Sequence, residues 1–292
     1  MDDRVKRGTA SMISILGFMR EISLGIHTLS VHLLLHNAIF IPSIIFNAQA
    51  WSNVTEKDIC KLTTIQLKFL KKTMNAKQAA ANSFVFLELG ILPVRYEIHK
   101  RQLSFLYHII HLNEDDPVKK VWRFQRTLPS YGNWWNGVEK LLEKYQIDLN
   151  EEQIMTMSKE TFKQKVKKEV RRVALEEMIQ ENQTKKKTKH IKYNELKAQS
   201  YITELYTSHS RIIFKCRSQT LNIKQHMKYQ YENNKHCRWC GVSDETMQHI
   251  VNCGSDGPVI SDVERIVQEG NDLEQMKNIA ERIENFLDRV EV

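Results

Sequence analysis

Four residues near the C-terminal end of the chain have the types and the spacing of a metal site. Cys237 and Cys240 enclose two residues, and His249 follows that pair after eight more. Cys253 comes after a further three, which gives the pattern C-x2-C-x8-H-x3-C. Two close thiolates grip one ion from a tight turn, and a His and a Cys one helical turn apart complete a tetrahedron. Since four protein ligands leave no position for a reacting water, the pattern predicts one structural Zn²⁺.

Other interpretations of these cysteines and histidines stay open in the sequence. His236 adjoins Cys237 and is a competing ligand, although the order Cys, His, Cys fits His249 better. A C-x-x-C pair also serves as a redox motif, but no βαβ pattern surrounds this one. Two unrelated cysteines beside a core histidine are a further alternative. Cys60 and Cys216 are expected to be buried or half-buried thiols without a chemical role.

A basic segment with interleaved aromatic residues precedes the metal pattern. Cations neutralise phosphates and release counterions, and rings between them can stack on unpaired bases. A run of charge alone is more typical of a solvated face, but its position beside a metal pattern favours contact with nucleic acid. Trp239 is either a stacking residue or core packing of the zinc unit. The expected nucleic-acid contacts are Arg211, Lys215, Arg217, Lys224, Lys228, Lys235 and Trp239.

The charge balance also indicates a polyanionic partner. The formal net charge is +8, and the isoelectric point is near 9.1. The basic excess lies between residues 159 and 197 and again between residues 211 and 240. After Cys253 the chain has ten acidic and four basic residues, so this tail could cover the basic face when no nucleic acid is present.

Several functional classes are excluded or disfavoured by what the sequence lacks. It contains no P-loop, no G-x-S-x-G and no H-E-x-x-H, and no catalytic residue is predicted. Five cysteines without a signal peptide do not resemble a disulfide framework, so an intracellular location, nuclear or cytoplasmic, is expected. Residues 22–55 carry no formal charge, but His32, His36 and Pro42 interrupt the apolar run. A buried helix is therefore expected there, and no membrane partner.

The spacing of apolar residues predicts a mainly α protein. Only 10 Gly and 5 Pro in 292 residues provide little turn punctuation. Four regions are expected: a helical bundle over 1–112, a Trp-containing and basic helical region with a polar linker over 113–190, a basic segment with a CCHC zinc module over 191–256, and one or two acidic helices over 257–292.

Several stretches of the chain resemble the region after the polymerase core in reverse transcriptases of non-LTR, LINE-like retrotransposons. They are RVKRG at 4–8, IFNAQAW at 45–51, LELGILPVRY at 87–96, RSQTLNIK at 217–224 and ETMQHIVNC at 245–253. The resemblance implies a thumb-like helical bundle, a linker and a zinc knuckle, with element RNA or target DNA as partner. It also implies that the polymerase's aspartates are absent from this sequence, so the chain is not expected to be an enzyme on its own.

A second hypothesis assigns the zinc site a different task. In this view the ion only organises a surface for a protein partner. Such binding would depend on buried aromatic side chains and would respond little to salt.

Overall fold

The computed structural model of this chain describes most of its residues, with short gaps. These residues are mainly helical, as the sequence predicts, and their only β pairing is an isolated bridge between His236 and Asp244. No helix in these ranges is both long and apolar enough to cross a membrane. The described residues are 1–21, 28–52, 54–128, 132–227, 234–254 and 257–290.

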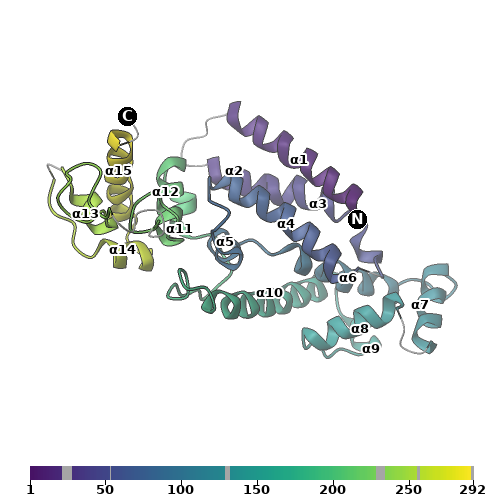
Figure 1. Cartoon of the computed structure of the whole chain (residues 1–292). Coiled ribbons are helices and arrows are strands. Elements are labelled where there is room, and N and C mark those ends of the chain that lie inside the picture. The colour runs from purple at the N-terminus through teal and green to yellow at the C-terminus, as the bar shows by residue number, and fades with distance from the viewer. Residues whose placement is uncertain (22–27, 53, 129–131, 228–233, 255–256, 291–292) are drawn as a thin grey trace. The chain divides into compact units, whose positions relative to one another are not determined.

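The helices are labelled in Figure 1. In the first half of the chain they are α1 (Asp2–Glu21), α2 (Thr28–Leu35), the π-helical turn η2 (His36–Phe40), α3 (Ile41–Ile44), the 3-10 turn η3 (Ala48–Ala50), α4 (Glu56–Thr73), α5 (Asn82–Leu89), α6 (Val94–Ile110), α7 (Pro117–Thr127) and α8 (Trp134–Lys144). In the second half they are α9 (Glu151–Thr156), α10 (Lys159–Gln183), α11 (Ser200–Glu204), α12 (Thr207–Arg217), α13 (Met247–Asn252), α14 (Val263–Glu269) and α15 (Leu273–Val290).

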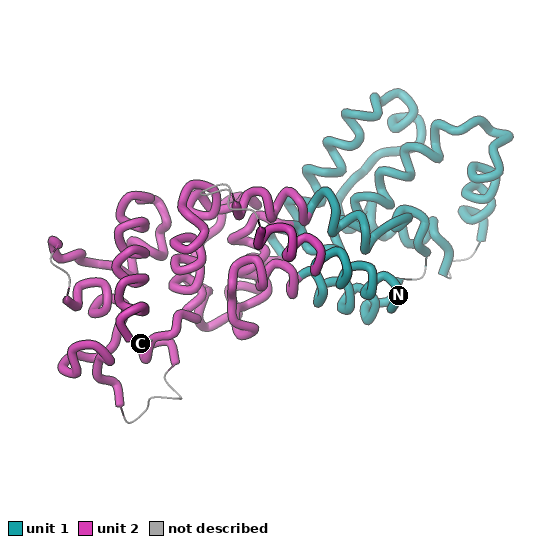
Figure 2. Tube along the Cα trace, turned by 90° about the horizontal axis from the view of Figure 1, so that it is seen from above, with its two compact units in different colours: residues 1–12, 37–66, 92–177 teal, residues 13–36, 67–91, 178–292 magenta. Residues whose placement is uncertain are grey.

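The chain forms two compact units, which are coloured separately in Figure 2. Neither unit is one continuous stretch of sequence. Residues 67–91 group with the C-terminal part of the chain, whereas the sequence had assigned them to an N-terminal bundle. Unit 1 contains residues 1–12, 37–66 and 92–177, and unit 2 contains residues 13–36, 67–91 and 178–292.

Unit 1 is organised around α6, which packs against η3, α7, α8 and α9. A buried amide fixes the start of α6, because Gln66 accepts from Val94 N at 2.8 Å and donates to Leu92 O at 2.9 Å. Further along α6, His99 Nδ1 lies 2.6 Å from the Tyr145 hydroxyl. These polar contacts lie among buried apolar side chains, so they give the helix a defined register in the core.

In unit 2, the short helix α5 is buried on every side. It ends at Gly90, whose φ is +62° and where a Cβ atom would lie 2.2 Å from Ala198 N. Only glycine adopts this backbone so close to another chain segment without strain. Glu88 of α5 is fully buried and pairs with Arg217 of α12, Nη2 to Oε1, at 2.9 Å. The ion pair therefore joins α5 to the C-terminal part of the unit.

Helix α15 supplies the apolar face on which the C-terminal helices of unit 2 pack. It contacts α11, α12, α13 and α14, and Figure 1 shows α13 and α14 beside it. Its buried side chains recur at helical spacing, and they are Met276, Ile279, Ala280, Ile283 and Phe286. The sequence had predicted an acidic helix here. Glu274, Glu281 and Asp288 are exposed, whereas Glu284 is half-buried and lies 3.3 Å from His209 Nε2.

The polar linker expected before residue 190 is replaced by folded structure. Helix α10 continues to Gln183, and the next turn folds back on it. Thr188 is 1% exposed, and it exchanges two hydrogen bonds with Asn182, at 2.7 and 2.9 Å. Ile191 and Tyr193 then enter the core. Asn182 and Thr188 satisfy each other, and Lys187 donates to Gln219 O at 2.9 Å, so the polar composition of this stretch does not signal a solvated linker.

Candidate metal centre and basic residues

The four residues of the predicted metal site converge in unit 2. One donor atom from each of Cys237, Cys240, His249 and Cys253 lies within 4.8 Å of the other three. The two measured edges are 3.9 Å between the Sγ atoms of Cys237 and Cys253, and 3.4 Å between Cys240 Sγ and His249 Nε2. A tetrahedral zinc site with usual bond lengths needs edges of about 3.8 Å for two sulfurs and about 3.6 Å for sulfur and nitrogen. The donor atoms are therefore spaced as they would be around one tetrahedrally coordinated ion.

A tight turn and a short helix position these donors. Within the turn, Trp239 N donates to Cys237 Sγ at 3.4 Å, and Gly241 N donates to Cys237 O at 2.9 Å. Gly241 has a φ of +69°, which glycine adopts at little cost. On the other side, the Thr246 hydroxyl caps α13 by accepting from His249 N at 3.1 Å. Both halves of the site are thus fixed by hydrogen bonds that backbone N–H groups donate.

Glu245 is a buried carboxylate that holds the cysteine turn in place. It is 1% exposed and accepts from Arg238 N at 2.9 Å and from Lys224 N at 3.1 Å. The Arg238 guanidinium completes the group, with its Nη2 2.8 Å from Glu245 Oε1. Since Arg238 stands between the first two cysteines, these bonds fix the spacing of the turn. The sequence analysis did not identify this pair, although an Arg inside the turn and a Glu shortly after it were visible.

The electrostatic environment differs among the cysteines. Backbone N–H groups of Ser243 and Val242 point at the Cys240 sulfur and lower its pKa to about 6. Burial instead raises the pKa of Cys253 to about 12. A bound cation would deprotonate coordinating thiols whatever their intrinsic pKa. The arrangement is therefore suited to a metal ion that neutralises neighbouring thiolates.

The remaining candidate ligands lie outside this cluster. His236 is exposed, and its Nδ1 is 3.1 Å from Val242 O, so the described geometry favours His249. Cys216 is buried in α12, and burial raises its pKa to about 12. Cys60 was expected to be a buried or half-buried thiol, and this prediction is wrong, because Cys60 is exposed on α4.

Two of the predicted nucleic-acid contacts are buried, and the prediction is corrected for them. Arg217 is 2% exposed, because it pairs with Glu88 and also donates to the carbonyls of Val267 and Gln268. Lys224 is 7% exposed, and its Nζ donates to His236 O at 2.7 Å. Both cations hold the fold together, so neither is available to a phosphate.

The other predicted contacts are distributed over several surfaces. Lys235 and Trp239 are exposed beside the metal cluster, and Lys215 is partly exposed on α12. Trp239 is 46% exposed as a residue, and the Arg289 guanidinium lies 4.9 Å from the centroid of its ring. Arg211 is half-buried and donates to Thr73 O at 3.0 Å. Lys228 lies outside the described residues.

The chain was also compared with known proteins. No protein-family model matches it, and neither a curated protein nor a solved structure is significantly similar to it.

Proposed function

We propose that this chain binds nucleic acid through unit 2 and that one structural Zn²⁺ stabilises the binding module. The observation that carries the proposal is the donor spacing of Cys237, Cys240, His249 and Cys253, which suits a tetrahedral ion. These residues would hold the ion through three sulfurs and one nitrogen, a set that zinc prefers. The ion would supply folding free energy to the segment that carries these four residues.

The nucleic-acid part of the proposal is supported by charge and by one exposed ring. The chain carries a net charge of +8, which favours a polyanionic partner. Lys235 and Trp239 lie exposed next to the metal cluster, so a phosphate and an unpaired base could be contacted together. The Arg289 guanidinium lies 4.9 Å from the centroid of this ring and adds a cation beside it.

The proposed origin is the C-terminal region of a non-LTR retrotransposon reverse transcriptase. Support comes from the motifs named above and from their order, with helices first and the Cys/His cluster near the end. On this proposal the chain has no polymerase site, and its partner is element RNA or target DNA. A thiolate site needs a reducing environment, which supports an intracellular location.

A protein-binding module is the second candidate function. It is favoured by two apolar side chains on the cysteine turn, since Trp239 is 46% and Val242 is 76% exposed. Exposed apolar side chains close together are typical of protein contacts. The salt dependence of binding distinguishes the two candidate functions, because phosphate contacts weaken steeply with ionic strength and apolar contacts do not.

The test measures metal content and binding to single-stranded RNA and duplex DNA over a salt series. It uses the full chain, Cys240→Ser, and Cys60→Ser as a matched control, because Cys60 is exposed and outside the cluster. The proposal expects one zinc per chain and salt-steep binding, both lost in Cys240→Ser and kept in Cys60→Ser. Zinc without nucleic-acid binding would favour the protein-binding module, and no zinc would refute both.

A further inference from the structure

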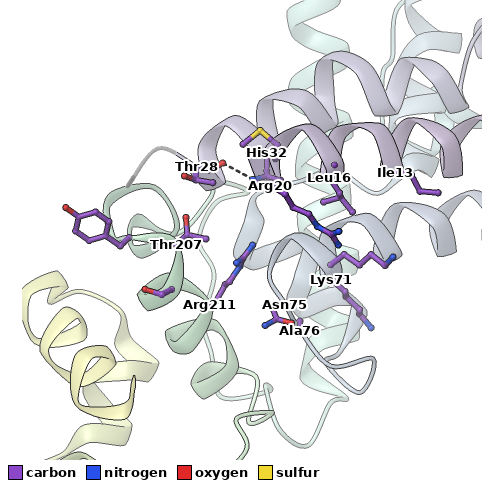
Figure 3. A pocket seen from close by; sticks show the side chains of 15 residues that line it. Ile13, Leu16, Arg20, Thr28, His32, Lys71, Asn75, Ala76, Thr207 and Arg211 are labelled. Carbon is purple, nitrogen blue, oxygen red and sulfur yellow. Dashed lines mark hydrogen bonds between the residues drawn. The ribbon is translucent and has the colours of Figure 1, made fainter. Parts of the chain in front are cut away.

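A cavity in unit 2, away from the metal cluster, gathers positive charge. It has a volume of about 770 Å³ and lies between α1, α2, α4 and the start of α12. All its lining residues belong to unit 2. Figure 3 shows Arg20 extending from α1 and Arg211 extending from α12 into the space between these helices. The volume is within the range of sites that hold small molecules or parts of larger ligands.

The cavity has four cationic side chains and no acidic one among its lining residues. Arg20 and Lys72 are exposed at its rim, whereas Lys71 and Arg211 are withdrawn from solvent. His32 also lines the cavity, but burial lowers its pKa, so it stays neutral near pH 7. The positive charge is therefore not balanced by a carboxylate in the wall.

Removing Lys71 and Arg211 from solvent costs desolvation free energy, which a bound anion would offset. Lys71 is 4% exposed, and its Nζ donates to Gln78 O at 2.8 Å and to Asn82 Oδ1 at 2.9 Å, which are neutral acceptors. Arg211 likewise donates to the neutral Thr73 O. Burial lowers the pKa of both side chains. Because a desolvated charge is stabilised most by an opposite charge, the cavity favours an anionic ligand.

The start of α12 adds hydrogen-bond donors to the same cavity. Thr207 and Ser208 line it, and the N-cap residue Tyr206 makes no side-chain cap bond, so the first N–H groups of this 11-residue helix have no side-chain cap. Thr207 Oγ1 is buried and has no hydrogen-bond partner within the described part of the chain. A buried hydroxyl without a partner is costly unless a ligand supplies one. Tyr206, 54% exposed at the rim, offers a ring for stacking.

We propose that this cavity binds backbone phosphates of a single-stranded nucleic acid, with Arg20, Lys72 and Arg211 as the phosphate contacts and Tyr206 stacking on an adjacent base. The proposal rests on the proposed function for its ligand, and it adds a second contact region apart from the metal module. Lys71 lines the cavity but donates to Gln78 O and Asn82 Oδ1, so it contributes through its charge rather than as a phosphate contact. Phosphate is the anion whose several oxygens match donors from three helices at once.

The test compares two double variants that remove the same charge. Arg20→Gln with Lys72→Gln removes both positive charges at the rim of the cavity. Both residues are exposed, and neither has an ion pair in the described structure. Lys68→Gln with Lys189→Gln is the matched control, because both are exposed in unit 2 and neither lines the cavity. Binding of a single-stranded RNA of about 12 nucleotides without terminal phosphates is measured from about 50 to 200 mM salt. Circular dichroism and Tm establish that each variant is folded.

The expected result is a change confined to the cavity variant. Each phosphate contact contributes about 0.7 to the steepness of the plot of log K against log salt concentration for a single strand. Because the cavity variant lacks two such contacts, its slope should be shallower than that of the control by about 1.4. Equal slopes in the two variants, with RNA bound by the unaltered chain, would overturn the cavity proposal and leave the proposed function standing.

Inorganic phosphate separates the two proposals if the unaltered chain binds no RNA. A rise in Tm with phosphate that the cavity variant lacks and the control keeps would support an anion site while refuting nucleic-acid binding. The control accounts for the general stabilising effect of phosphate on folded proteins. No difference in Tm between the variants would then overturn the anion site as well.

Discussion

Replacing Glu245 by Gln should loosen the metal cluster although Glu245 is not a ligand. The carboxylate accepts from Lys224 N, Arg238 N and the Arg238 guanidinium. Gln keeps the shape but has one acceptor oxygen, and its amide group would face donors. Two charge-assisted bonds at about 1.5–3 kcal/mol each are lost. Because the Arg238 side chain is 23% exposed, water recovers part of this, and we expect a loss of about 3 kcal/mol in the unfolding free energy.

The same change should weaken metal binding, since the turn that holds Cys237 and Cys240 loses its anchor. Residues that orient metal ligands change affinity by about 10- to 100-fold when they are mutated. The assay is competition for Zn²⁺ between the protein and a chromophoric chelator. Asp244→Asn is the control, because Asp244 is the exposed neighbour and makes only backbone contacts in the described structure. If Glu245→Gln binds zinc within about twofold of this control, the anchoring argument is wrong.

Three further changes test the fold. Glu88→Gln leaves the buried Arg217 uncompensated, and urea unfolding should show a loss of about 3–5 kcal/mol. Gly90→Ala places a Cβ 2.2 Å from Ala198 N at a φ of +62°, and the same assay should show a loss of at least about 2 kcal/mol. Burial lowers the pKa of His99 from 6.5 to about 3, so the unfolded chain binds the extra proton between these values. Stability should therefore fall by about 1.4 kcal/mol per pH unit as pH drops below 6.5, and His99→Gln should flatten this slope.

The metal cluster was predictable because its information is local. All four ligands lie between Cys237 and Cys253, and the spacing alone restricts how they can meet. The helical class was predictable for a similar reason, since apolar periodicity is read within single segments. Pro42 shows the limit of that reading. The sequence predicted a buried helix around this residue. In the structure the helix changes to a π-helical turn from His36 to Phe40 just before it, because a proline ring disturbs the turn that precedes it.

The roles of individual cations were not predictable in the same way. Arg217 and Lys224 have the same charge as Lys235, but their burial depends on distant partners. Arg217 meets Glu88, which lies 129 residues away, and no local pattern encodes that pairing. The cavity cations come from three separate helices for the same reason. The sequence therefore showed where basic residues are concentrated. It did not distinguish buried basic residues that stabilise the fold from those exposed to solvent.

The ion pair between Glu88 and Arg217 also imposes an order on folding during synthesis. The two residues are 129 positions apart, and a ribosome adding about 5–20 residues per second takes about 6–26 s to cover this distance. Throughout that interval α5 has emerged without the partner of its buried carboxylate. A nascent chain that stalls before Arg217 therefore exposes an apolar helix to the solvent. Such intermediates are the species that chaperones hold and that aggregate when they are not held.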